Sequence, residues 1–117
     1  MKVYYLGSCS TCQLILKEAG LNQRGFTLQD IKTDPLTPNQ LDALRALSGS
    51  YASLFSRRAI KYRQLGLHEQ QLTEADYRRL ILEEYTFLKR PVIEYQGRLF
   101  IGSEKKTVAA LQDALNA

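Results

Sequence analysis

Two cysteines, Cys9 and Cys12, are the residues of this chain best suited to carry out chemistry. A strand-like run at residues 3–6 leads through Gly7 and Ser8 directly into Cys9, and a helical pattern follows. The unpaired N–H groups and the dipole at a helix N-terminus favour an anion. A thiolate is such an anion, so we predict that Cys9 has a lowered pKa and acts as a nucleophile at neutral pH. Cys12 lies about one helical turn further on, where it can attack an oxidised or modified Cys9, and we expect its pKa to be ordinary.

The same two cysteines allow two other interpretations. A Cys-x-x-Cys pair is half of a zinc site, but no second pair exists and His68 is the only histidine. A four-ligand zinc site within one chain would therefore need carboxylates, and we expect no metal. The cysteines could also be two inert, buried apolar side chains. We expect His68 to be exposed and without a catalytic role, which leaves Cys9 without a histidine base.

Length and composition limit the class of protein. A chain of 117 residues, 44% hydrophobic and 24% charged, predicts one soluble domain spanning 1–117. No apolar run approaches the ~20 residues of a membrane span, and no signal peptide is visible. We therefore expect a cytoplasmic protein whose cysteines are reduced at rest, and a monomer.

The chain is mildly basic, with a net charge of +4. Such a balance is typical of a solvated surface, but it also suits an oxyanion site or a contact with an acidic partner. The tyrosines show no spaced aromatic platform, so we expect no direct binding to nucleic acid.

Periodicity and turn signals divide the chain into short elements. We predict a strand at 2–6, a helix at about 10–19 ended by Gly20, and a strand at about 26–31. A helix should begin after Thr37, with Pro38 in its first turn and Gln40 reaching back. The apolar faces of these two helices would comprise Leu14, Ile15, Leu16 and Ala19 in the first, and Leu41, Leu44 and Leu47 in the second.

The second half predicts more helices and then a hairpin. Residues 51–66 suggest short helical pieces, and Thr73 with Asp76 forms a second capping box. Residues 91–95 and 98–101 read as a hairpin, and Ser103 is expected to cap a last helix. The order predicts an α/β, thioredoxin-like fold: a small mixed four-stranded sheet flanked by helices, with a helical insertion at about 37–86 between an N-terminal βαβ and a C-terminal ββα.

With these landmarks the chain resembles the arsenate-reductase-like (ArsC/Spx) branch of the thioredoxin fold, over nearly its whole length. The motifs that carry the resemblance are Ser8-Cys9-Ser10-Thr11-Cys12, Asp34-Pro35-Leu36-Thr37, Leu54-Phe55-Ser56-Arg57-Arg58, Tyr62-Arg63-Gln64-Leu65-Gly66-Leu67, Leu88-Lys89-Arg90-Pro91-Val92-Ile93 and Gly102-Ser103-Glu104.

The resemblance implies roles for individual residues. Cys9 would be the nucleophile, Arg90 would lie over it, Pro91 would follow a cis peptide bond, and Cys12 would close a disulfide with Cys9. A guanidinium near a thiolate lowers its pKa and offers a planar fork to an oxyanion. Substrate or anion contacts are expected from Ser8, Ser10, Thr11, Arg57, Arg58 and Pro91.

The chain also departs from the arsenate reductases it resembles. Ser56 occupies the position of their second arginine, where Arg57 or Arg58 would have to substitute, and Gly102 occupies the position of the third. Those reductases usually have serine at the second motif position, so Cys12 together with Gly102 favours the Spx-like and uncharacterised members of the family. Spx regulators extend past the last helix, whereas this sequence stops at Ala117.

Three functions follow from the resemblance. The first is a cytosolic thiol–disulfide oxidoreductase without a bound cofactor, acting on a small oxyanion or thiol substrate. Arsenate is one candidate, and glutathione, glutaredoxin or thioredoxin is the expected electron donor. The second is an Spx-like redox-sensing regulator that binds RNA polymerase through a Cys9–Cys12 switch. The third is a fold relic without turnover.

Overall fold

The computed structural model describes all 117 residues, which form two compact units. The first unit consists of Met1–Asp34 and Arg90–Ala117, and the second of Pro35–Lys89. The second unit contains the expected helical insertion and is slightly wider than the predicted 37–86. The assignment of residues 1–117 to one domain stays a prediction.

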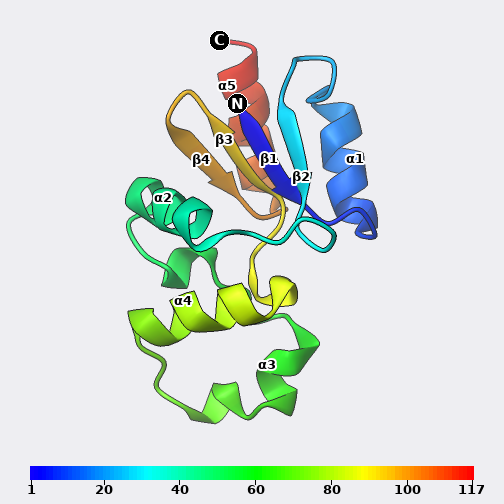
Figure 1. Ribbon diagram of the computed structural model, residues 1–117. Coiled ribbons are helices and arrows are strands. Elements are labelled where there is room, and N and C mark those ends of the chain that lie inside the picture. The colour runs from blue at the N-terminus through cyan, green and yellow to red at the C-terminus, as the bar shows by residue number, and fades with distance from the viewer. The chain divides into compact units, whose positions relative to one another are not determined.

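A four-stranded mixed sheet organises the first unit (Figure 1). Its strands are β1 (Lys2–Tyr5), β2 (Thr27–Asp30), β3 (Val92–Tyr95) and β4 (Arg98–Ile101), in the order β2-β1-β3-β4. β1 runs parallel to β2 and antiparallel to β3, and β3 and β4 form the expected hairpin. The helix α1 (Ser10–Glu18) connects the two parallel strands, which cannot be joined by a tight turn. The predicted fold class is confirmed.

The core of the first unit lies between this sheet, α1 and the last helix α5 (Lys105–Leu115). Val3, Ile93 and Phe100 occupy neighbouring positions in register on three strands, and all are buried. They belong to one buried cluster with residues of both helices. The remaining buried members of the cluster are Ile15, Leu16, Ala19, Leu21, Phe26, Leu111 and Leu115. This packing fixes the carboxyl end of β1, from which the chain enters the cysteine motif.

Three details of the sequence prediction are wrong. Leu14 is 54% exposed, because successive helical residues are rotated by about 100° and Leu14 points away from Ile15 and Leu16. Leu47 is 49% exposed, since it lies six residues after Leu41, and six residues turn it about 120° away from Leu41 around the helix α2 (Pro38–Ser48). The last helix is capped by Glu104 rather than Ser103, without a side-chain capping bond.

The second unit is mostly helical. Its elements are α2 (Pro38–Ser48), η1 (Ala52–Leu54), α3 (Ile60–Gln64), η2 (Leu67–Glu69), α4 (Glu74–Glu83) and η3 (Tyr85–Phe87). Both predicted capping boxes are present, at Thr37 with Gln40 and at Thr73 with Asp76. The core of this unit forms around the buried Phe55 ring, whose centroid lies 4.8 Å from that of Tyr77 and 5.1 Å from that of Phe87.

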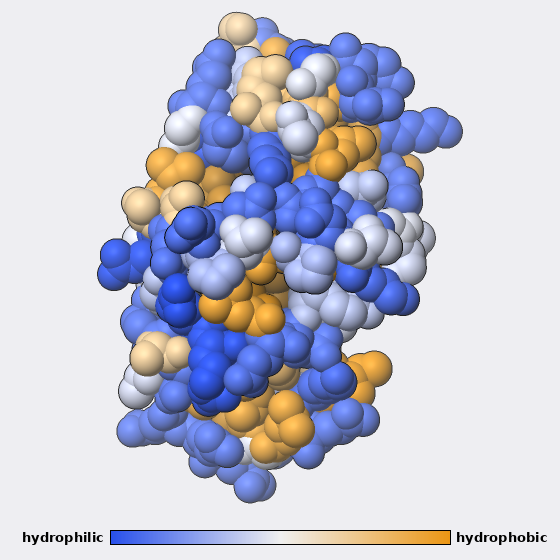
Figure 2. Space-filling view, in the orientation of Figure 1, coloured by the Kyte–Doolittle hydropathy of each residue, from blue (hydrophilic) through white to orange (hydrophobic).

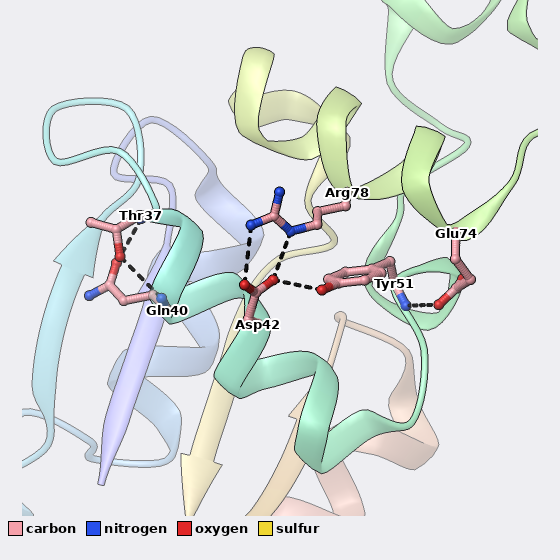
Figure 3. Close-up of polar contacts among 6 residues, drawn as sticks. All are labelled: Thr37, Gln40, Asp42, Tyr51, Glu74 and Arg78. Atoms are coloured by element: carbon pink, nitrogen blue, oxygen red, sulfur yellow. Dashed lines mark hydrogen bonds and ion pairs between the residues drawn. The ribbon is translucent and has the colours of Figure 1, made fainter.

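A polar network joins α2, η1 and α4 (Figure 3). Asp42 Oδ1 accepts hydrogen bonds from Tyr51 Oη at 2.6 Å and from Arg78 Nε at 2.8 Å, and its Oδ2 accepts one from Arg78 Nη2 at 3.1 Å. The Glu74 carboxylate accepts the N–H groups of Tyr51 and Ala52 at 2.8 and 3.0 Å. The hydrogen bonds from Arg78 and Tyr51 lower the pKa of Asp42 to about 2.

The surface carries scattered hydrophobic residues. On the face seen in Figure 2, hydrophobic patches are separated by hydrophilic side chains. The large exposed hydrophobic residues are Met1, Leu14, Leu28, Leu47, Ile60 and Leu65. None of the helices has the length and apolar character needed to cross a membrane.

Candidate active site

Cys9 lies at the junction between a tight turn and a helix. The turn is closed by a hydrogen bond from the Cys9 N–H to the Leu6 carbonyl oxygen, at 3.0 Å. Cys9 is the N-cap of α1, with extended backbone at φ −90° and ψ 111°, and its carbonyl accepts the Gln13 N–H at 3.1 Å. The predicted position of Cys9 at the start of the helix is therefore confirmed.

The surroundings of Cys9 favour its thiolate. Partial burial is the largest single influence and acts against ionisation. Hydrogen bonds from the backbone and the thiol of Cys12, a hydrogen bond from the backbone of Thr11 and the charge of Arg90 together outweigh it. The pKa of Cys9 is consequently lowered from its ordinary value of 9.0. The sequence pattern predicted the helix N–H groups, and the resemblance implied the cation, whereas the hydrogen bond from the Cys12 thiol was not predicted.

Cys12 differs from the ordinary thiol that was expected. Its side chain is fully buried, and burial raises its pKa to about 11. The hydrogen bond to Cys9 and the negative charge on Cys9 add to this shift, while the backbone of Leu6 and the charge of Arg90 oppose it. Cys12 therefore remains protonated and donates its S–H to Cys9. The prediction failed because the sequence did not show how completely this turn of α1 is covered.

Arg90 and Pro91 lead into β3, next to the cysteine motif. Val92 pairs with Tyr4, so the start of β3 lies beside the end of β1. The Arg90–Pro91 peptide bond is cis, as the resemblance implied. Pro91 is almost completely buried, and its carbonyl accepts the Gly102 N–H at 2.9 Å. The charge of Arg90 favours ionisation of both cysteines, which places it within electrostatic reach of each thiol.

The other predicted contact residues have different positions. Ser8, Ser10 and Thr11 are exposed around Cys9, and Thr11 contributes its backbone N–H. Arg57 and Arg58 belong to the second unit, where Arg57 Nη2 donates to the Tyr77 hydroxyl at 3.1 Å. Their role at an anion site stays a prediction.

Two polar residues that the sequence analysis did not select contact the same turn. The Asp30 carboxylate accepts the Gly7 N–H at 3.2 Å, and Gln13 Nε2 donates to the Gly7 carbonyl oxygen at 2.8 Å. A signal for Asp30 existed, because the carboxyl ends of neighbouring parallel strands meet at one edge of a sheet. Asp30 ends β2, and Gly7 follows β1.

The side chains around the cysteines suit thiol chemistry. No group of three or more His, Cys, Asp or Glu side chains is arranged to hold a metal ion. Both cysteines are free thiols, one activated and partly exposed, the other protonated and buried behind it. Such a pair can attack an electrophile with the first sulfur and release the product with the second.

Comparison with known proteins gives a consistent family assignment. A model of the ArsC family matches residues 4–111. The chain is 26% identical to the global transcriptional regulator Spx 2 of Bacillus anthracis over 101 residues, which cover 86% of this chain and 77% of that protein.

Solved structures agree on the fold. An arsenate reductase from Vibrio cholerae is 19% identical, with a TM-score of 0.75 over 95% of this chain and 98% of that one. An arsenate reductase (ArsC) related protein from Brucella melitensis is 24% identical, with a TM-score of 0.72 over 93% of this chain and 91% of that one. At these identities the two structures establish the fold alone.

Proposed function

Because this chain belongs to the ArsC family, we propose that it is a thiol–disulfide oxidoreductase in which Cys9 is the nucleophile and Cys12 the resolving thiol. The observation that carries the proposal is the unequal cysteine pair. Cys9 is favoured as a thiolate, and Cys12 donates a hydrogen bond to it from a buried site with a pKa of about 11. Two inert buried thiols would both have raised pKa values, whereas the pKa of Cys9 is lowered.

The pair can supply two electrons to arsenate, the first candidate substrate. The Cys9 thiolate attacks arsenic(V), an As–O bond breaks, and protonation of the departing oxygen gives water. The Cys12 sulfur then attacks the sulfur of the Cys9 adduct as it loses its proton. The S–As bond breaks, its electron pair stays on arsenic, and arsenite leaves with the proton. Arsenic(V) becomes arsenic(III), and the two thiols become one disulfide.

Arg90 would hold the oxyanion while Cys9 attacks. A guanidinium binds such an anion through paired N–H donors, and it stabilises the thiolate before the substrate arrives. The exposed hydroxyls of Ser8, Ser10 and Thr11 would surround the same anion. A glutathione mixed disulfide is the second candidate substrate, since its sulfur can replace arsenic in the first step. Glutathione with glutaredoxin, or thioredoxin, would return the Cys9–Cys12 disulfide to two thiols.

The test is an arsenate reduction assay coupled to NADPH oxidation, run once with glutathione and glutaredoxin and once with thioredoxin and its reductase. We expect turnover with one donor system, loss of turnover in Cys9→Ser, and a trapped adduct in Cys12→Ser. Arg90→Ala should raise KM for arsenate. Lys89→Ala, which removes the same charge from an exposed neighbouring side chain, is the matched control.

A redox titration in glutathione buffers completes the test. Mass spectrometry should find an intramolecular Cys9–Cys12 disulfide that forms reversibly. Absence of that disulfide, together with no reduction of arsenate or of a glutathione mixed disulfide by either donor system, would contradict the proposal.

The similarity to a transcriptional regulator supports a second candidate. In that case the Cys9–Cys12 pair would be a switch and RNA polymerase the partner. A pull-down of polymerase subunits with reduced and oxidised protein separates the two functions, because a regulator should bind in a redox-dependent manner and show no turnover.

A further inference from the structure

We infer that Asp30 is a positioning residue that holds the turn carrying Cys9, and that Gly7 is its partner in this task. The inference rests on the proposed function in one respect, namely that Cys9 is the nucleophile whose place matters. Neither residue belongs to the cysteine motif or to the Arg-Pro pair.

Asp30 stands where it can link two strands. It is the last residue of β2, and it pairs in register with Tyr5, the last residue of the parallel strand β1. The backbone bond from the Ile31 N–H to the Tyr5 carbonyl, at 2.9 Å, continues this pairing. The chain leaves β1 through Leu6 and Gly7, directly beside the Asp30 side chain.

Each oxygen of the Asp30 carboxylate accepts one backbone N–H. Oδ2 accepts the Gly7 N–H at 3.2 Å, and Oδ1 accepts the Lys32 N–H at 3.0 Å. The hydrogen bond from Lys32 closes a local turn, in which the aspartate side chain binds the backbone two residues further along. This bond holds the carboxylate in one orientation. Asp30 therefore offers Gly7 a fixed acceptor that is anchored to the end of β2.

Gly7 is held from both sides and has no space for a side chain. Its carbonyl oxygen accepts the Gln13 amide at 2.8 Å, so both polar groups of this residue are bound. A Cβ built on Gly7 would lie 2.5 Å from Asp30 Oδ2, closer than side-chain carbon and oxygen can approach. The need for glycine here arises from this contact, since the other six glycines have φ above +60° and Gly7 does not.

The position of Gly7 determines that of Cys9. Only Ser8 separates Gly7 from Cys9. The turn is closed by the hydrogen bond from the Cys9 N–H to the Leu6 carbonyl oxygen. The Cys9 sulfur must lie where the N–H groups of Thr11 and Cys12 and the charge of Arg90 act on it. Releasing Gly7 from Asp30 would let this turn move relative to the helix N-terminus.

The negative charge of Asp30 and its positioning of the turn predict opposite effects on the ionisation of Cys9. The single variant Asp30→Ala therefore distinguishes the two roles. If Asp30 acted only through its negative charge, its removal would favour the Cys9 thiolate. If it positions the turn, its removal disfavours the thiolate. The measurement is the rate of Cys9 alkylation by iodoacetamide against pH, followed by mass spectrometry of the Cys9 peptide. Asp113→Ala, which removes an exposed aspartate from α5, controls for net charge.

We expect Asp30→Ala to slow alkylation at pH 7 by about three- to tenfold, because a displaced turn would cost the Cys9 thiolate one hydrogen bond of ordinary net strength. The pH profile should move upward, and Asp113→Ala should match the wild type. An unchanged or faster rate in Asp30→Ala would overturn the inference. If that variant does not fold by circular dichroism, Asp30→Asn replaces it, because the amide has an NH2 group in place of one of the two acceptor oxygens. Slower alkylation than in the wild type is expected there too, and an unchanged or faster rate would overturn the inference.

Gly7→Ala provides an independent test of the pairing. Its new methyl group must displace the carboxylate, so it should slow Cys9 alkylation as Asp30→Ala does. In the double variant Gly7→Ala with Asp30→Ala, no carboxylate remains to clash with the new methyl group or to accept the N–H of residue 7. Cys9 in the double variant should therefore be alkylated at the same rate as in Asp30→Ala. Effects that multiply instead would show that the two residues act separately.

These outcomes are separable from the proposed function. Wild-type protein without turnover or a reversible Cys9–Cys12 disulfide would contradict the proposed oxidoreductase, while the alkylation rates still decide whether Asp30 positions Cys9.

Discussion

Replacing Cys12 by alanine or by serine separates the effect of its hydrogen bond from the effect of its sulfur. The Cys12 thiol donates to Cys9 from a fully buried position, so the cavity left by alanine offers no donor in its place. A serine hydroxyl can still donate. We therefore expect Cys9 to be less reactive in Cys12→Ala than in Cys12→Ser.

The size of the difference follows from the exposure of Cys9. A hydrogen bond to a charged acceptor contributes about 1.5–3 kcal/mol. Cys9 is only partly buried, and solvent screening reduces this to about 1 kcal/mol. That corresponds to about a fivefold smaller ionisation constant of Cys9 in Cys12→Ala. The backbone N–H groups of residues 11 and 12 remain, so most of the lowering of the Cys9 pKa should persist.

The assay is the pH profile of iodoacetamide alkylation at Cys9, which is the only cysteine in both variants. Wild-type protein provides a further check, because a buried thiol with a pKa of about 11 should not be labelled near pH 7. Equal Cys9 profiles in the two variants, or a faster Cys12→Ala, would refute the hydrogen bond as a cause of the Cys9 pKa. Labelling of Cys12 before Cys9 in the wild type would refute the assignment of the nucleophile.

Three further predictions concern other contacts. Arg90→Ala should slow Cys9 alkylation at pH 7 and Arg90→Lys should restore part of it, since a positive charge near the thiolate lowers the Cys9 pKa; equal rates in all three proteins would contradict this. Thr37→Ala should lower the free energy of unfolding in urea by about 1 kcal/mol because it breaks the capping box of α2, whereas Thr37→Ser should keep it. The pKa of Asp42 is lowered from 3.8 to about 2, so its stabilising bonds are complete above pH 3.8 and are lost as the pH falls toward 2. Asp42→Asn should therefore lose less stability than the wild type between pH 4 and pH 2, measured as the change in thermal unfolding temperature. An equal loss in the two proteins would show that Asp42 does not contribute to it.

Local signals in the sequence were sufficient for much of the fold. The helix N-terminus at Cys9 and the Thr37 capping box depend on neighbouring residues, which the sequence displays directly. The exposure of Leu14 and Leu47 was not predicted, because an apolar residue near a stripe does not reveal how far around the helix the contact extends. The high pKa of Cys12 depends on burial by packing, which spacing alone does not give.

The contact of Asp30 with Gly7 shows a different limit of prediction from the sequence. The two residues are 23 positions apart, and their hydrogen bond exists only because β1 and β2 pair in parallel and in one register. The order of elements predicts that parallel pairing, but it does not show which side chains meet at the ends of the two strands. The roles of Arg57 and Arg58 depend on the arrangement of residues distant in the chain, which no local pattern provides.

The pairing of β1 with β3 also bears on how the protein is made. Lys2 pairs with Glu94, so the central strands of the sheet are joined across most of the chain. On a ribosome, β1 and the cysteine motif emerge long before β3 and Arg90, while the intervening unit can already begin to fold. During that interval β1 lacks its central partner, and Cys9 lacks the cation that favours its thiolate. Until the last segment is synthesised, the nascent chain therefore carries Cys9 without the Arg90 charge that helps to lower its pKa.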